Sequence, residues 1–219
     1  MRYGEHPEQV VDVTGEGPVV AVIHGGCWRA RYTRAISADV AADLAGRGYR
    51  VANVEYRRLD AGGGWPEPLD DALAALAAVH AELVVGHSAG GHLALLASAA
   101  TGLPAVAQAP VADLALAVAL GACAGAAERL LAMGAASPTA RPATVPHLVL
   151  HGDADTDVPV ALGRAYAARA AACTYRELPG CGHLEHLDPT SSAWAEAYGW
   201  ISAQLPSGTG SRTADSPRS

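Results

Sequence analysis

The sequence predicts an α/β protein with a mostly parallel central sheet and helices on both faces of that sheet. The main observation is that short apolar runs alternate along the chain with longer segments of helical periodicity, which is typical of βαβ units. The second observation is chain length, because 219 residues suffice for one substantial core and hardly for two domains. We therefore expect a single domain over residues 1–205.

The apolar runs predict the strands, and the periodic segments between them predict the helices. Val19–Ile23, Leu83–Val85 and Leu148–Leu150 are continuous apolar runs, as expected for strands that are buried on both faces. Strands are expected near residues 9–13, 19–23, 50–55, 83–86, 105–109, 147–151 and 174–178. Helices are expected near residues 34–47, 67–79, 89–100, 160–172 and 191–204.

Two segments depart from this alternation. Residues 113–145 are expected to form a small cap insert, with one or two helices between Asp113 and Met133. Residues 206–219 are rich in Ser, Thr, Gly and Pro and show no apolar periodicity, so we expect a disordered tail.

The segment Gly86-His87-Ser88-Ala89-Gly90 follows a predicted strand and opens a predicted helix. A G-x-S-x-G pattern in that setting is typical of a nucleophile elbow, a sharp strand-to-helix turn that exposes the serine hydroxyl. The flanking glycines allow the backbones to pass closely, and the small Ala89 leaves the approach to the hydroxyl open. Ser88 is therefore the candidate nucleophile, and the N–H of Ala89 is a candidate oxyanion donor.

A serine nucleophile needs a histidine base, and the base needs a carboxylate to orient it. Two loops after Ser88 contain such groups, each at the carboxyl end of a predicted strand, where open α/β sheets place catalytic residues. The segment 151–159 contains three candidate acids, Asp153, Asp155 and Asp157, and the segment 178–183 ends in His183. This agrees with the chain order serine, acid, histidine of the elbow architecture.

Upstream of the elbow, a predicted strand ends in His24-Gly25-Gly26-Cys27-Trp28. Glycines at this position allow backbone N–H groups to face a ligand, which matches an oxyanion loop of the H-G-G type. His24 is expected to brace this loop through hydrogen bonds rather than to transfer protons.

These motifs together resemble the α/β-hydrolase superfamily, in particular its small bacterial esterase and kynurenine-formamidase-like branch. The resemblance covers about residues 10–205 and rests on segments 24–28, 53–58, 86–94, 151–159 and 182–183. It implies the α/β-hydrolase fold and no cofactor. The family pattern H-G-x-x-D-x-x-V-P selects Asp155 as the acid. The chain is short for the superfamily, with a small insert and without the first strands.

The resemblance also implies roles for individual residues. Ser88 is the nucleophile, Asp155 orients the base and His183 is the base. Gly26 and Ala89 donate N–H groups to the oxyanion, and Cys27 is a third candidate donor.

Other residues have weaker functional readings. Trp28 and Trp65 are candidate substrate-binding residues for an apolar or aromatic group, and packing within their own loops is the equal alternative. His87, His92 and His151 are expected to be packed or to bond to backbone. Glu185 and His186 could line the pocket, although surface placement is favoured. No pair of the nine histidines has the spacing of a metal-binding motif, so no metal site is expected.

Composition narrows the class of partner. A formal charge of −7, with no basic stripe, argues against nucleic-acid binding. The apolar segment 114–127 is too short to span a bilayer, and the N-terminus has no apolar signal segment. Cys27, Cys123, Cys173 and Cys181 lack C-x-x-C spacing, so free thiols of a cytoplasmic protein are expected, with a Cys27–Cys181 contact conceivable. We expect a monomer or a homodimer.

Three functions are compatible with these features. The first is a serine hydrolase that cleaves carboxylic esters of small acyl or aryl substrates through an acyl-enzyme. The second is an arylformamidase that hydrolyses N-formylkynurenine with the same residues. The third is a non-catalytic ligand-binding protein on a hydrolase fold, which the presence of every expected triad member disfavours.

Overall fold

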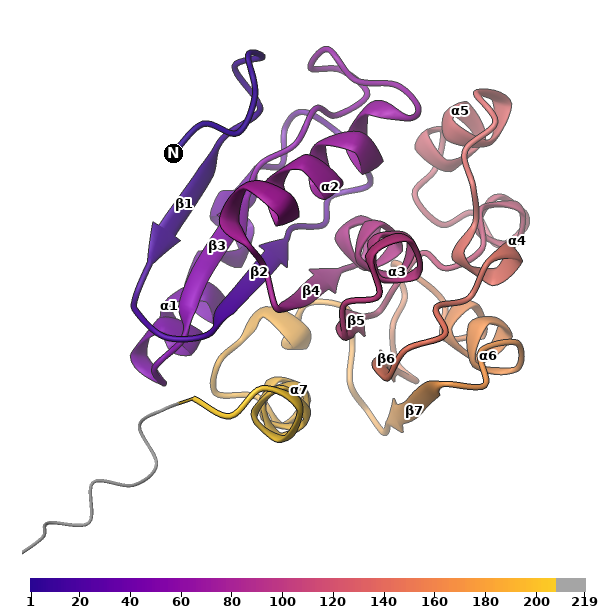
Figure 1. Cartoon of the computed structure of the whole chain (residues 1–219). Helices are drawn as coiled ribbons and strands as arrows, with labels where there is room; N and C mark the ends of the chain where they lie inside the picture. Colours follow the sequence, from indigo (N-terminus) through magenta and orange to yellow (C-terminus); the bar gives the residue numbers. More distant parts are fainter. Residues whose placement is uncertain (208–219) are drawn as a thin grey trace, which may run out of the picture.

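A computed structural model describes residues 1–207 and contains one seven-stranded sheet of order β1-β3-β2-β4-β5-β6-β7. Strand β1 pairs antiparallel with β3 at one edge, and every other pairing is parallel (Figure 1). The strands are β1 Val11–Thr14, β2 Val19–Ile23, β3 Arg50–Val54, β4 Leu83–His87, β5 Ala105–Gln108, β6 His147–Gly152 and β7 Cys173–Leu178. The predicted mostly parallel sheet is confirmed.

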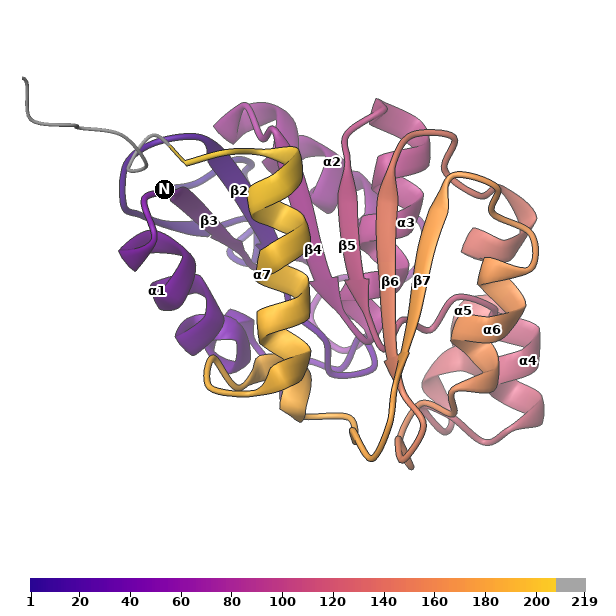
Figure 2. The same cartoon turned by 90° about the horizontal axis from the view of Figure 1, so that it is seen from below.

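Helices cover both faces of the sheet, as expected. The α-helices are α1 Ala38–Gly46, α2 Glu67–Val79, α3 Ala89–Thr101, α4 Leu114–Ala119, α5 Ala126–Ala132, α6 Ala161–Ala167 and α7 Ser192–Gln204. Short 3-10 turns span Arg34–Ser37, Pro138–Ala140 and Glu185–Leu187. Helices α1 and α7 pack on one face, and α2, α3 and α6 pack on the other (Figure 2).

The alternation of side chains along the strands explains the two cores. In β2, Ala21 and Ile23 contribute to the core under α2 and α3, while Val20 and Val22 contribute to the core under α1 and α7. Successive strand residues point to opposite faces, so a strand covered on both sides must be apolar throughout. This is why the strands read as continuous apolar runs.

Two predicted helices are shorter than the sequence suggests. The segment 34–47 begins as a 3-10 turn before α1, and the segment 160–172 is helical only over Ala161–Ala167. The chain must leave α6 early because Cys173 already begins strand β7, with its N–H donating to the carbonyl of Ala170.

The cap insert contains two short helices, α4 and α5, at the edge of the sheet where the parallel strands end (Figure 2). The predicted disordered tail, residues 206–219, lies outside the described residues except for its first two positions.

The backbone crossing at the elbow brings β2, β4 and α3 together. A Cβ atom on Gly90 would lie 2.0 Å from the carbonyl oxygen of Ile23, and one on Gly86 would lie 2.2 Å from the carbonyl oxygen of Gly90. Neither contact leaves room for a side chain. The carboxyl ends of β2 and β4 and the first turn of α3 are therefore held in direct backbone contact.

We expect Gly90→Ala to lower the free energy of unfolding by about 3 kcal/mol or more, because the added methyl group would overlap backbone that cannot move alone. Gly199→Ala is the matched control, because Gly199 lies in α7 and nothing lies within 4 Å of its added Cβ. That change should stabilise by about 0.5–1 kcal/mol through helix propensity. Urea denaturation measures the free energy of unfolding of both variants. Equal values for the two variants would contradict the close contact between Gly90 and the carbonyl of Ile23.

Candidate active site

Ser88 lies between β4 and α3 in a strained backbone conformation. Its φ is 56° and its ψ is −117°, a region that residues other than glycine seldom occupy and that costs about 1–3 kcal/mol. The surrounding backbone holds it there, since the Ser88 N–H donates to the carbonyl of Gln108 at 2.8 Å and the Ser88 carbonyl accepts from the N–H of His92 at 3.1 Å. The elbow geometry expected from G-x-S-x-G is present.

Ser88 borders a cavity of about 920 Å³ at the carboxyl ends of the strands. The cavity is lined by segments that are far apart in the sequence: the loop after β2, the elbow, the cap, and the loops after β6 and β7. Its lining residues include Gly26, Cys27, Arg29, Tyr32, Ser88, Cys123, Asp157, Val158, His183 and Leu184. The predicted nucleophile and the predicted base therefore face one cavity.

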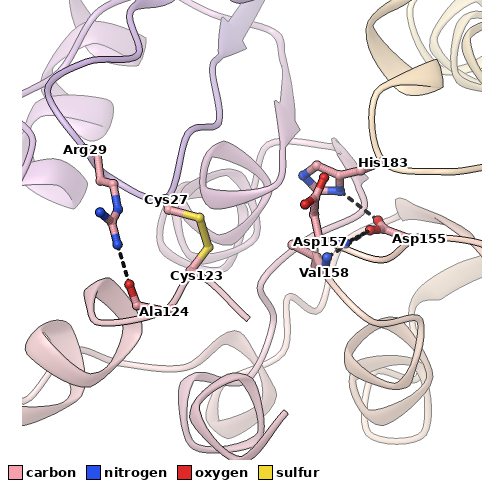
Figure 3. The surroundings of a disulfide bond; sticks show 8 residues. All are labelled: Cys27, Arg29, Cys123, Ala124, Asp155, Asp157, Val158 and His183. Atoms are coloured by element: carbon pink, nitrogen blue, oxygen red, sulfur yellow. Dashed lines mark hydrogen bonds and ion pairs between the residues drawn. A yellow bond between two sulfur atoms is a disulfide. The ribbon is translucent and has the colours of Figure 1, made fainter. Parts of the chain in front are cut away.

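Asp155 and His183 are hydrogen bonded to each other. The distance from His183 Nδ1 to Asp155 Oδ2 is 2.7 Å, and the other carboxylate oxygen, Oδ1, accepts the backbone N–H groups of Asp157 and Val158 (Figure 3). Burial acts to raise the pKa of Asp155, but the hydrogen bonds from His183 and Val158 outweigh it and hold the pKa below its usual value. Asp155 is thus an ionised, oriented partner for the imidazole.

The loop that carries His183 is also held from the elbow. His87 Nε2 lies 2.9 Å from the backbone carbonyl oxygen of His183 and donates to it, and the two rings lie 4.5 Å apart. Among the hydrogen bonds of residues 1–207 there is none between Ser88 and the His183 ring. Such contacts commonly tighten only when substrate is bound.

Three backbone N–H groups beside Ser88 are free to donate hydrogen bonds to a ligand. Within the described residues, the N–H groups of Gly26, Cys27 and Ala89 donate to no protein acceptor. Ala89 is the first residue of α3, so its N–H has no partner inside the helix. Of the three predicted oxyanion donors, Gly26 and Cys27 line the cavity, and Ala89 directly follows Ser88, which also lines it.

His24 braces the oxyanion loop, as expected. Its Nε2 lies 2.8 Å from Glu55 Oε1, its Nδ1 lies 2.7 Å from the carbonyl oxygen of Gly25, and its own carbonyl accepts the hydroxyl of Tyr56. Glu55 is 2 % exposed and also binds Arg58. No role for Glu55 was predicted from the sequence. A charged residue directly after a buried strand was nevertheless a signal that this side chain has a structural or functional role.

The expectation of four free thiols is wrong. Cys27 and Cys123 form a disulfide across 96 residues, with their Cα atoms 5.3 Å apart, and only Cys173 and Cys181 are free (Figure 3). The conceivable Cys27–Cys181 pair is also wrong. The missing C-x-x-C spacing was uninformative because the fold, and not the local sequence, brings the cap against the oxyanion loop.

The prediction that Trp28 and Trp65 contact substrate is not supported, since neither lines the cavity. Trp28 is fully buried, and its ring meets the ring of His92 edge-on at 5.2 Å. Trp65 also packs on His92, at 5.9 Å. Trp28 therefore packs in the core, whereas the neighbouring Cys27 borders the cavity.

Three further histidines, His92, His151 and His186, are fully buried. His92 Nε2 donates to the carbonyl of Ala136 and His151 Nε2 donates to that of Val158, as expected. His186 is fully buried, so the favoured surface placement is wrong for it, whereas Glu185 is exposed as expected.

Residues 1–207 contain no group of three or more His, Cys, Asp or Glu side chains that could hold a metal ion. None of the helices in this range is long and apolar enough to cross a membrane.

Comparison with known proteins supports the fold. Residues 11–110 match the family model described as BD-FAE, and no curated protein sequence matches the chain. The matched segment includes the oxyanion loop and the elbow.

Solved structures of esterases share the architecture. A truncated carbohydrate esterase from gut microbiota superposes with a TM-score of 0.73 at 19% identity, covering 93% of this chain and 94% of that one. Esterase B from Lactobacillus rhamnosis, inhibited by a tributyrin phosphonate, has a TM-score of 0.72 at 20% identity, with 93% and 84% covered. Est1E from Butyrivibrio proteoclasticus with bound ferulic acid has a TM-score of 0.69 at 18% identity, with 89% and 95% covered. At these identities the likeness establishes the α/β-hydrolase fold.

The buried His92 should make stability depend on pH. Burial lowers its pKa to about 4, whereas an unfolded histidine titrates near about 6.5. Between these values the unfolded chain binds the extra proton, so the free energy of unfolding should fall as the pH falls from about 6.5 to 4, by up to about 3 kcal/mol from this residue. Urea denaturation of wild type and His92→Gln at several pH values measures the effect. A His92→Gln variant with the same pH dependence as wild type would contradict it.

Proposed function

We propose that this chain is a serine hydrolase that cleaves carboxylic esters of small acyl or aryl groups through an acyl-enzyme. The observation that carries the proposal is the Asp155–His183 hydrogen bond, formed at the cavity that Ser88 also borders. Free backbone N–H groups beside Ser88 supply the remaining element that ester hydrolysis needs.

In the first half of the reaction, Ser88 Oγ attacks the ester carbonyl carbon and passes its proton to His183 Nε2. Asp155 holds the imidazole through Nδ1 and stabilises the imidazolium that forms. The negative charge on the carbonyl oxygen is stabilised by the N–H groups of Gly26, Cys27 and Ala89. His183 then returns the proton to the leaving oxygen, and the alcohol departs.

In the second half, water takes the place of the alcohol. His183 accepts a proton from the water as it attacks the acyl-enzyme, and the same N–H groups stabilise the second oxyanion. Collapse of this intermediate releases the carboxylic acid and returns the proton to Ser88.

The cavity is of the size that holds a small-molecule substrate, and the cap beside it is small. A cavity of about 920 Å³ lies at the upper end of typical ligand sites, and the cap over it consists of only two short helices. Its lining mixes apolar side chains such as Ile36 and Leu187 with Arg29, Tyr32 and Asp157. Short-chain or aryl esters fit such a site better than long lipids.

The compartment remains a prediction. Cytoplasm was expected because all the cysteines were read as free thiols. Because Cys27 and Cys123 form a disulfide, the free-thiol argument for the cytoplasm no longer holds, and an oxidising compartment is favoured.

The first test compares kcat/KM for phenyl acetate and N-formylkynurenine, with Ser88→Ala as the blank. We expect wild type to hydrolyse phenyl acetate and Ser88→Ala to lose at least about 10³-fold, because the members of the triad act as a unit. A several-hundredfold preference for the formamide would make the chain an arylformamidase. Rates equal to the blank for both substrates would favour the ligand-binding alternative.

A second test separates Asp155 from its neighbour. Asp155→Asn should lower kcat by about 10³–10⁴-fold, because the imidazole loses the charge that orients it. Asp157→Asn is the matched control, since the Asp157 side chain is exposed at the cavity and only its backbone N–H binds Asp155. It should retain kcat within about threefold. Similar losses in both variants would contradict the assignment of Asp155 as the orienting acid.

A further inference from the structure

The disulfide joins the oxyanion loop to the cap. Cys27 directly follows Gly26, and its own N–H is one of the three groups without a protein acceptor. Its partner Cys123 lies between α4 and α5, in the cap. Figure 3 shows this bond on one side of the site and the Asp155–His183 pair on the other. Both cysteines line the cavity.

A second contact joins the same two segments. The Arg29 guanidinium donates to the backbone carbonyl of Ala124, the residue after Cys123 (Figure 3). The Arg29 N–H donates to the carbonyl of Gly26 at 3.0 Å, which closes the turn that contains Cys27. The oxyanion loop is thus attached to the cap at two nearby positions.

The loop needs such attachment because its backbone is strained. Cys27 and Trp28 have φ values of 49° and 53°, and each residue other than glycine in this region costs about 1–3 kcal/mol. Trp28 is held by burial in the core, whereas Cys27 is only partly buried. The disulfide is the covalent restraint on Cys27, whose N–H would stabilise the oxyanion in the proposed reaction.

We infer that Cys123 is a positioning residue for the proposed hydrolysis: through its bond to Cys27 it holds the oxyanion loop in its active shape, so that turnover depends on the oxidation state of this pair. The inference rests on the proposed function for its effect on rate. Its structural part, the dependence of the loop on the disulfide, can be measured without any substrate.

The redox step is a two-electron thiol–disulfide exchange. A dithiol such as dithiothreitol attacks one sulfur as the thiolate and forms a mixed disulfide, and its second thiol then displaces the protein sulfur. Cys27 and Cys123 end as thiols, and the reagent ends as a cyclic disulfide. Reoxidation by a disulfide reagent reverses the step.

The effect should appear in kcat and not in KM. Oxyanion donors act on charge that develops only in the transition state, so a misplaced donor lowers kcat while ground-state binding is retained. Loss of one donor typically costs about 10²–10³-fold. For a loosened loop we expect kcat to fall about 10- to 100-fold and KM to change by less than about threefold.

The experiment compares oxidised and reduced wild type with Cys123→Ala and Cys123→Ser, at a temperature where circular dichroism shows each to be folded. Thiol titration in denaturant should find two thiols in the oxidised chain and four after reduction. Reduction should lower kcat of wild type, and the Cys123 variants should match reduced wild type and not respond to reductant. Cys173→Ala is the matched control, because Cys173 lies in β7 outside the pair, and it should keep wild-type kcat and its response to reductant.

Two readouts separate positioning from general destabilisation. The inhibition constant of phenylboronic acid, whose tetrahedral adduct with Ser88 places a negative oxygen at the oxyanion site, should rise in proportion to the fall in kcat. Amide hydrogen exchange should accelerate in residues 24–29 on reduction and stay unchanged in β6.

Three results would overturn the inference. They are four thiols in the unreduced chain, an unchanged kcat after reduction has been verified, and unchanged exchange over residues 24–29. Absence of Ser88-dependent hydrolysis in the oxidised wild type would instead refute the proposed function, and the exchange measurement would still decide whether the disulfide holds the loop.

Discussion

The direct backbone contact between helix α3 and strand β2 is the constraint on which the geometry of the site depends. Gly90 lies against the carbonyl of Ile23 with no space for a side chain between them. Because Ile23 is the last residue of β2, this contact sets the distance from the oxyanion loop to the start of α3, where Ser88 and Ala89 lie. Ser88 and the free N–H groups beside it are therefore placed by backbone packing, which is stiffer than side-chain contact.

A buried carboxylate fixes the other side of the oxyanion loop. Glu55 accepts hydrogen bonds from His24, from the backbone N–H of Arg34 and from the Arg58 side chain. A charge buried to this degree is tolerated only when it is fully paired, and removal of one partner typically costs about 3–5 kcal/mol. The pairing thus ties three chain segments to one point, and the loop at His24 cannot shift without breaking it.

Much of the candidate site could be predicted from the sequence because it is encoded locally. Ser88 follows a strand and opens a helix, and Asp155 and His183 follow strands whose carboxyl ends share one edge of the sheet. What failed depended on long-range packing. Trp28 is turned from the cavity by its packing against His92 of α3, and Cys27 finds a partner only because of where the cap folds. Neither the packing of Trp28 nor the pairing of Cys27 is encoded in the periodicity or the motif spacing of the sequence.

The histidines around the site show how burial can assign a single proton acceptor. His87, His151 and His186 surround His183, and burial lowers the pKa of each, that of His186 to about 4. They are neutral near pH 7, so they serve as hydrogen-bond donors and spacers and add no positive charge beside the reacting groups. His183 differs from them because the ionised Asp155 accepts its Nδ1–H at 2.7 Å. In the proposed reaction, the hydrogen bond to Asp155 is what makes His183, rather than His87, His151 or His186, the group that takes the proton from Ser88.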